Sequence, residues 1–82
     1  REKRKSVTFR APFTSVPTVH CSLTLWDIDS STNVRVDLEA EHITLEGFDI
    51  VFRTWGDTKV ARVRVGWMAI GEIANEDDWQ LY

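Results

Sequence analysis

Cysteine, methionine, proline and glycine are all scarce in this chain of 82 residues, which contains one Cys, one Met, two Pro and four Gly. A single cysteine excludes an intrachain disulfide, and the residue spacing of a metal cluster is absent. No hydrophobic run is long enough to span a membrane. The net charge of −3 is mild and does not indicate a polyanionic partner such as nucleic acid. These absences leave one small domain without disulfide or metal cross-links.

The length of the chain limits the size of its hydrophobic core. A domain this small buries a modest fraction of its surface, so we expect association with copies of itself to add stability. The chain starts without Met or a signal-like apolar stretch, which is typical of a mature product or of a domain from a larger protein. We expect a single domain over residues 1–82. Residues 71–82 form an acidic extension around Trp79, Leu81 and Tyr82, which could pack across a sheet edge or lie loose.

A two-residue alternation of apolar and polar side chains dominates the chain. It is clear at residues 19–26, 34–41, 48–53 and 61–69, and residues 6–10 form a shorter candidate. Because successive side chains of a strand point to opposite faces, each run predicts a strand with one face in a core. No window shows a convincing 3.6-residue period. Five or six antiparallel strands with short loops therefore predict an all-β sandwich.

The segment 53–60 carries the most informative local pattern. Trp55 ends one alternating run, Gly56 and Asp57 follow as a two-residue turn, and a second run begins. This predicts a tight β-hairpin with an indole at its tip. Trp55 is out of phase with the apolar residues before it, so its side chain is directed away from the core. A rigid aromatic at a turn suits the apolar face of a ligand, and packing within the hairpin is an equally open interpretation.

The other tryptophans and the cysteine are assigned by their phase in the alternation. Trp67 lies on the apolar phase of its run, which predicts a core position. Trp26 lies on the opposite phase, which favours a sheet edge or a subunit contact. Cys21 lies on an apolar phase and is expected to be a buried, inert thiol.

Charged side chains of opposite sign lie on two different runs. Asp37, Glu39 and Glu41 share a face of one run, and Arg62 and Arg64 share a face of another. If the two strands are adjacent, these charges pair across the sheet as a solvated surface, where each exposed pair contributes about 0–1 kcal/mol. The alternative is that the charges meet between subunits around a symmetry axis.

No pattern in the sequence supports catalysis or cofactor binding. There is no Ser-His-Asp order with a nucleophile turn and no phosphate-cradling glycine loop. A calcium-loop-like start at residues 27–31 lacks the required Gly and the closing Glu, so an acid-capped turn is expected there. The basic residues 1–5 are expected to be a frayed, solvated terminus. We therefore expect a protein that is not an enzyme, has no metal or cofactor, and neither binds nucleic acid nor inserts into a membrane.

An ordered set of short motifs resembles the H-type lectin domain, the family of the snail agglutinin and of the C-terminal domain of the discoidins. No one motif is specific, but the ordered set covers residues 6–70 with compatible spacing. The motifs are Val7-Thr8-Phe9, Pro12-Phe13, Pro17-Thr18-Val19, Leu25-Trp26-Asp27, Asn33-Val34-Arg35-Val36, Gly47-Phe48, Thr54-Trp55-Gly56-Asp57-Thr58-Lys59-Val60 and Gly66-Trp67-Met68-Ala69-Ile70.

The resemblance implies a six-stranded antiparallel β-sandwich that assembles as a homotrimer, with stacking into a hexamer left open. It implies binding of galactose- or N-acetylgalactosamine-containing glycans in clefts between protomers, and hence an extracellular or cell-surface protein with a role such as cell adhesion. Arg35 matches the arginine that hydrogen-bonds sugar hydroxyls. Trp55 matches the tryptophan that an adjacent protomer places beside the sugar, and Asp57 matches a polar turn residue near the site.

Two residues depart from the pattern of the snail agglutinin. Gly56 stands where that protein has a histidine against the ligand, and Ala61 stands where it has a tyrosine. An aspartate that the family offers from an N-terminal loop would precede Arg1. The alternative hypothesis is therefore a structural or adhesive oligomerisation module with a degenerate sugar site, and a third is an appendage domain of a larger enzyme.

Overall fold

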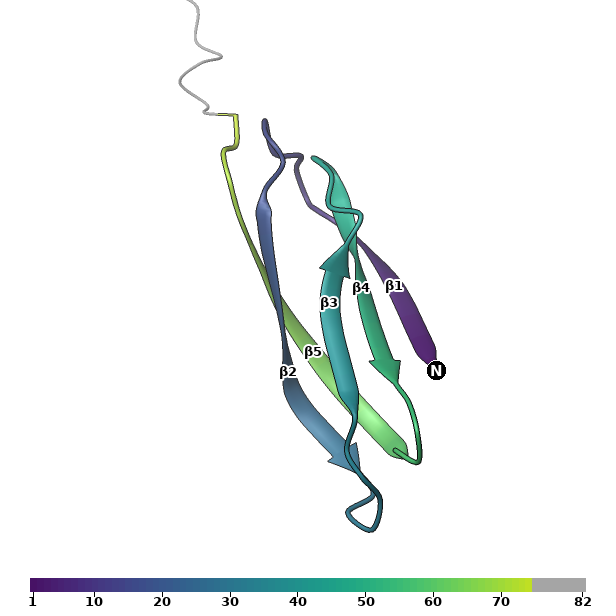
Figure 1. Cartoon of the computed structure of the whole chain (residues 1–82). Coiled ribbons are helices and arrows are strands. Elements are labelled where there is room, and N and C mark those ends of the chain that lie inside the picture. The colour runs from purple at the N-terminus through teal and green to yellow at the C-terminus, as the bar shows by residue number, and fades with distance from the viewer. Residues whose placement is uncertain (75–82) are drawn as a thin grey trace, which may run out of the picture.

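The structure is a computed structural model that describes residues 1–74, so the expectations for Trp79, Leu81 and Tyr82 lie outside the described residues. It contains five strands: β1 (Glu2–Thr8), β2 (Thr18–Ile28), β3 (Val36–Glu41), β4 (Gly47–Thr54) and β5 (Val60–Ile70). Two antiparallel sheets face each other, one in the order β1-β4-β3 and the other containing β2 and β5 (Figure 1). The predicted all-β antiparallel architecture is confirmed. The resemblance implies six strands, whereas residues 1–74 form five.

The first strand corrects the expectation of a frayed terminus at residues 1–5. β1 already begins at Glu2 and pairs with β4 along its whole length, from Glu2 opposite Arg53 to Thr8 opposite Gly47. Its basic composition suits an edge strand, because charged side chains there stay solvated and discourage pairing with further strands. Opposite Thr8, a Cβ on Gly47 would lie 2.1 Å from the carbonyl oxygen of Val7. Gly47 is therefore required for this close approach and not for a turn.

The hairpin predicted at Gly56 and Asp57 is wrong in its pairing. These residues do form the turn, but β4 pairs with β1 and β3, whereas β5 pairs with β2. The turn therefore carries the chain from one sheet to the other. Two apolar runs around a turn look the same in both arrangements, which is why the sequence pattern did not separate them. Trp55 is 52% exposed, as its phase predicted.

The aromatic core lies between the two sheets and is small. Phe48 is 3% exposed and packs against Trp67 and Phe9, with ring centroids 5.2 and 5.8 Å away. Phe9 also meets Phe13 edge-on at 5.0 Å. Trp67 was expected in the core but is 43% exposed. Its ring packs against Phe9 and Phe48, and it also lines the groove between β1, β4 and β5.

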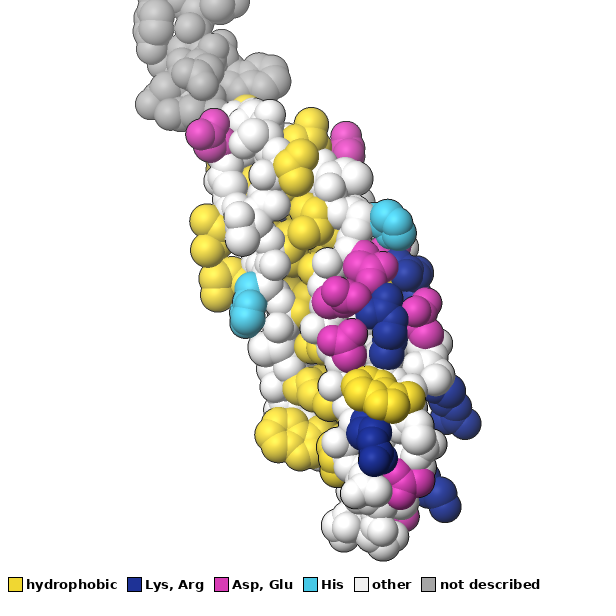
Figure 2. Space-filling view, viewed as in Figure 1, with side chains coloured by type: hydrophobic (Ala, Val, Ile, Leu, Met, Phe, Trp, Pro, Cys, Tyr) yellow, Lys and Arg dark blue, Asp and Glu magenta, His cyan; other side chains and the backbone are white. Residues whose placement is uncertain are grey.

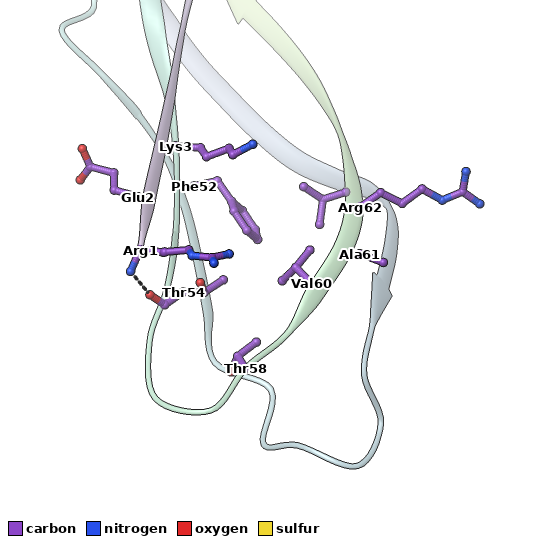
Figure 3. Close-up of a pocket in the computed structure, with 10 residues that line it drawn as sticks. Arg1, Glu2, Lys3, Phe52, Thr54, Thr58, Val60, Ala61 and Arg62 are labelled. Carbon is purple, nitrogen blue, oxygen red and sulfur yellow. Dashed lines mark hydrogen bonds between the residues drawn. The ribbon is translucent and has the colours of Figure 1, made fainter.

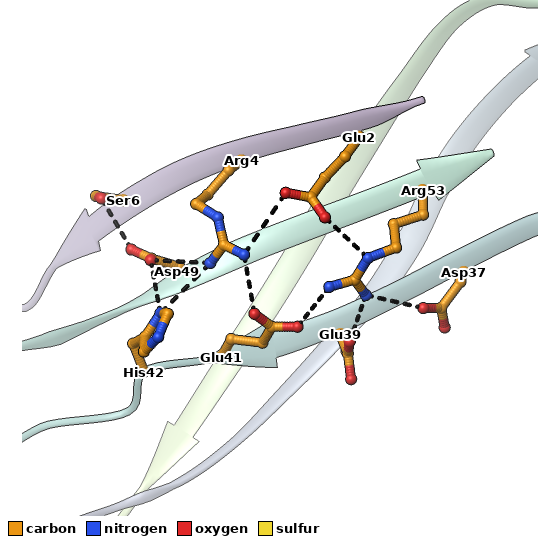
Figure 4. Close-up of polar contacts among 9 residues, drawn as sticks. All are labelled: Glu2, Arg4, Ser6, Asp37, Glu39, Glu41, His42, Asp49 and Arg53. Carbon is orange, nitrogen blue, oxygen red and sulfur yellow. Dashed lines mark hydrogen bonds and ion pairs between the residues drawn. The ribbon is translucent and has the colours of Figure 1, made fainter.

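An ionic network covers the outer face of the three-stranded sheet (Figures 2 and 4). Arg53 of β4 contacts Glu2 of β1 at 3.0 Å, and on β3 it contacts Asp37 at 3.1 Å, Glu41 at 2.7 Å, and Glu39. The hydrogen bond from Arg53 is the main cause that lowers the pKa of Glu41 to about 2. The predicted pairing of these β3 carboxylates with β5 is thus wrong, because the neighbour of β3 is β4.

One hydrophobic residue lies beneath this charged surface. Val51 points to the outer face of β4 yet is 0% exposed. Arg4 and Glu39 lie directly opposite it on the two flanking strands. The aliphatic stems of long charged side chains can cover apolar surface while their ends stay in water. The network therefore buries an apolar residue that strand alternation alone assigns to the solvent face.

The sandwich is open along one side. β2 approaches β3, whereas a groove separates β1 and β4 from β5. Two hollows of about 390 and 450 Å³ form this groove and share Lys3, Phe52 and Val63 in their lining. In Figure 3, Phe52 and Val60 line the groove from opposite sheets and Arg1 and Lys3 extend into it. Within residues 1–74, no strand pairs with the second edge of β5.

The part of the chain that the structure describes holds no helix of the length and hydrophobicity needed to cross a membrane.

Candidate ligand-binding site

The turn between the two sheets presents a large aromatic side chain beside a glycine in an unusual conformation. Gly56 has a φ of 70°, in the left-handed region that glycine adopts without steric cost. Trp55 precedes it, directly after the last residue of β4, and is 52% exposed. A tryptophan held by a tight turn offers a rigid apolar surface, with one N–H donor at its edge.

The turn is joined to the segment before β3 by an ion pair. Nη1 of Arg35 donates to Oδ1 of Asp57 at 2.8 Å, and both side chains remain partly exposed. The same Nη1 lies 3.1 Å from the position that a Cβ on Gly56 would occupy. The guanidinium therefore lies directly against the turn, at a place where a larger residue would displace it. Three of the predicted site residues, Arg35, Gly56 and Asp57, are brought together within one protomer.

Thr58 and Asn33 hold Arg35 and Asp57 in this geometry, and neither was predicted as a site residue. The backbone N–H of Arg35 donates to Oγ1 of Thr58 at 2.9 Å, and that hydroxyl donates to the carbonyl of Asn33 at 2.6 Å. The N–H of Asn33 donates to Oδ2 of Asp57 at 3.3 Å. This hydrogen bond lowers the pKa of Asp57, and the nearby charge of Arg35 acts in the same direction. Both residues stand in motifs of the lectin resemblance, and this was the only signal available for them.

A shallow hollow of about 670 Å³ lies under the turn. Residues 54–60 line it together with Arg1 and Thr32. Ala61, also predicted for the site, instead lies exposed on β5 and lines the groove with Phe52. The structure thus places Ala61 in a different hollow from Trp55 and Asp57.

The assembled groups are those of a binding site for a polar ligand with an apolar face. Arg35 supplies hydrogen-bond donors in a rigid plane, Asp57 is an ionised acceptor, and Trp55 offers a flat apolar surface. Within residues 1–74, no group of three or more His, Cys, Asp or Glu side chains is placed to hold a metal ion.

Comparison with known proteins identifies the family. Residues 4–70 match the H-type lectin domain. A protein of Fuscovulum blasticum named ATP synthase subunits region ORF 7 is 53% identical over 81 residues, which cover 99% of this chain and 70% of that protein. Discoidin-1 subunits A and B/C of Dictyostelium discoideum are each 34% identical over 70 residues. These matches cover 84% of this chain but only 28% of each discoidin subunit. The chain therefore belongs to the H-type lectin domain family and is a carbohydrate-binding domain of the lectin type.

Proposed function

We propose that this chain is a non-catalytic lectin that binds galactose- or N-acetylgalactosamine-containing glycans with Arg35, Trp55 and Asp57. The observation that carries the proposal is the ion pair of Arg35 with Asp57, in which Nη1 lies 2.8 Å from Oδ1, at a turn that also carries the exposed side chain of Trp55. The segment before β3 supplies the donor Arg35, and the turn supplies the acceptor Asp57 and the apolar surface of Trp55. These are the groups that a galactose-type sugar requires.

The chemistry of the sugar explains why these groups suffice. Galactose has vicinal hydroxyls on one side and a patch of C–H groups on the other. A guanidinium can donate to two adjacent hydroxyl oxygens, a carboxylate accepts from hydroxyls, and an indole covers the C–H patch. Each contact adds little net free energy, because water already satisfies the hydroxyls. A single site is therefore weak, and no chemical step on the sugar is needed.

We further propose that the functional form is a trimer of six-stranded protomers, in which Trp55 of a neighbouring copy completes each sugar cleft beside Arg35. Two features support it: the edge of β5 that no strand within residues 1–74 pairs with, and the exposed Trp26, Met68 and Ile70 on the two-stranded sheet. Exposed apolar surface of this kind marks sites of association. Several sites in one rigid assembly raise the overall affinity by up to about 10²–10⁴-fold when the geometry allows simultaneous binding. Such avidity suits an extracellular or cell-surface role in adhesion.

A glycan array with two matched pairs of variants tests the proposal. Trp55→Ala and Arg35→Ala should each lose binding to galactose-type glycans and keep the molar mass of the parent by light scattering. Val16→Ala and Arg10→Ala are the controls, because each truncates an exposed side chain, apolar in one case and basic in the other, at a position outside the site and outside the proposed association surface. Binding by both site variants as strong as that of the parent would exclude this site, and a monomeric mass for the parent would exclude the trimer.

The second candidate function is a structural or adhesive oligomerisation module with a degenerate sugar site. Gly56 and Ala61 favour it, because each provides less side chain for a ligand than the histidine and tyrosine expected from the resemblance. An intact trimer that binds no glycan on the array would establish this alternative.

A further inference from the structure

The hollow under the turn has an excess of positive charge. Arg1 and Lys59 both line it, and Asp57 is the one carboxylate among its lining residues. The backbone of Lys59 is held in place, because its carbonyl accepts a hydrogen bond from the N–H of Asp29 at 2.9 Å. Its side chain makes no hydrogen bond or ion pair with the residues that the structure describes. The backbone of Lys59 is therefore anchored in the lining of the hollow, and its exposed ammonium keeps its donors available.

The charge of the one carboxylate at the hollow is balanced by Arg35, although its oxygens can still accept further hydrogen bonds. Oδ1 of Asp57 accepts from Arg35 at 2.8 Å, and Oδ2 accepts from the N–H of Asn33 at 3.3 Å and from its side-chain amide at 3.5 Å. Arg35 does not line the hollow but neutralises the acid that does. The field at the hollow is therefore set by Lys59 and Arg1.

The largest acidic cluster among residues 1–74 lies away from the turn. Five of the chain's 13 acidic residues, Glu2, Asp37, Glu39, Glu41 and Asp49, form the ionic network on the three-stranded sheet, whereas Asp29 lies beside Lys59. The overall charge of −3 thus hides a local positive site at the turn. The hydroxyls of Thr32 and Thr58 are polar groups beside these cations, and Trp55 supplies the apolar wall.

We infer that the site selects anionic glycans, namely galactose-type sugars that carry a sulfate or a carboxylate, over their neutral counterparts. The inference rests on the proposed lectin function of the same turn. The sugar ring packs on Trp55, and its anionic group lies toward Lys59 and Arg1. Exposed ion pairs are individually weak and are screened by salt, so the preference is modest and falls with ionic strength.

The test measures binding of the protein to four immobilised glycans at low and at physiological salt. They are neutral galactose, 3-sulfated galactose, 6-sulfated galactose, and galactose capped with sialic acid. We expect about two- to fivefold tighter binding to at least one charged glycan than to neutral galactose, with the difference shrinking as salt rises. The sulfated and sialylated arms show whether sulfate or carboxylate is the preferred source of the negative charge.

Three variants separate a specific role of Lys59 from a general effect of charge. Lys59→Gln should remove most of the preference for charged glycans, and Lys59→Arg should keep it. Lys5→Gln removes the same charge from β1, away from the turn, and should also keep it. Circular dichroism and molar mass confirm that each variant is folded and assembled.

The outcomes distinguish this inference from the function on which it rests. Neutral galactose bound as tightly as every charged glycan overturns the inference and leaves the lectin function standing. An equal loss of preference in Lys59→Gln and Lys5→Gln also overturns it, because charge anywhere on the surface would then suffice. If no galactose-type glycan binds at all, the proposed function itself fails.

Discussion

The Cβ position of Gly56 lies 3.1 Å from Nη1 of Arg35, so a side chain at this position would press on the guanidinium that donates to Asp57 and shift it by a few tenths of an ångström. Glycine serves twice here, because its φ of 70° is also one that most L-residues avoid. The local backbone and the candidate site therefore depend on the same residue.

Substitution of Gly56 should affect stability and binding separately. Gly56→Ala is expected to lower the free energy of unfolding by about 1–2 kcal/mol, the usual cost of a left-handed conformation. Gly56→Asn should cost less, since asparagine tolerates this conformation. Both should weaken glycan binding, because either side chain pushes against Arg35. Urea unfolding and glycan titration measure the two effects, and wild-type affinity in both variants would contradict the contact.

The hydroxyl of Thr58 should matter more than its size indicates. It accepts from the N–H of Arg35 and donates to the carbonyl of Asn33, so Thr58→Val leaves both backbone groups without this partner. We expect a loss of about 1–2 kcal/mol in unfolding free energy, together with weaker glycan binding. Thr58→Ser keeps the hydroxyl and should retain most of both properties. Equal behaviour of the two variants in urea unfolding would show that the hydroxyl has no such role.

Val51 tests whether the ionic network buries an apolar residue. Removing two methyl groups from a site with 0% exposure should cost about 2 kcal/mol in Val51→Ala. The same substitution at Val34, which is 58% exposed, should change the stability by less than about 0.5 kcal/mol. Urea midpoints of the two variants give the comparison directly. Similar small effects at both positions would mean that the charged side chains do not shield Val51 in solution.

The network should also make the protein sensitive to acid. The pKa of Glu41 is about 2 in the folded chain and 4.5 ordinarily, mainly because Arg53 donates to it. A lowered pKa means that the ionised carboxylate stabilises the fold fully above pH 4.5, and that this contribution is lost as the pH falls toward 2. Glu41→Gln should therefore be less stable than the parent at neutral pH and approach it near pH 2. Urea unfolding across this range measures the difference, with Glu46→Gln as an exposed control, and a constant difference would refute the linkage.

Much of the architecture followed from local patterns in the sequence. The alternation over residues 19–26, 48–53 and 61–69 predicted β2, β4 and β5, and the phase of Trp55 predicted its exposure. Strand β1 was predicted only from residue 6 onward, because residues 1–5 are all charged and show no apolar alternation. Their strand conformation depends on pairing with β4. For the candidate site, the motifs indicated Arg35, Trp55 and Asp57 but gave no role to Asn33, Thr58 or Lys59. Their contacts join segments 23–30 residues apart, and no local pattern encodes such contacts.

By itself, the sequence determined which segments become strands, which of their faces are apolar, and that Gly56 and Asp57 turn the chain. These are properties of a few consecutive residues, since side-chain alternation and turn chemistry act over short distances. Only the tertiary structure decided that β4 and β5 enter different sheets, that Arg53 forms ion pairs with the carboxylates of β3, and that Val51 is buried. Strand pairing is a choice among distant segments with equally suitable patterns, and that choice is made when the two sheets pack together and bury their apolar faces.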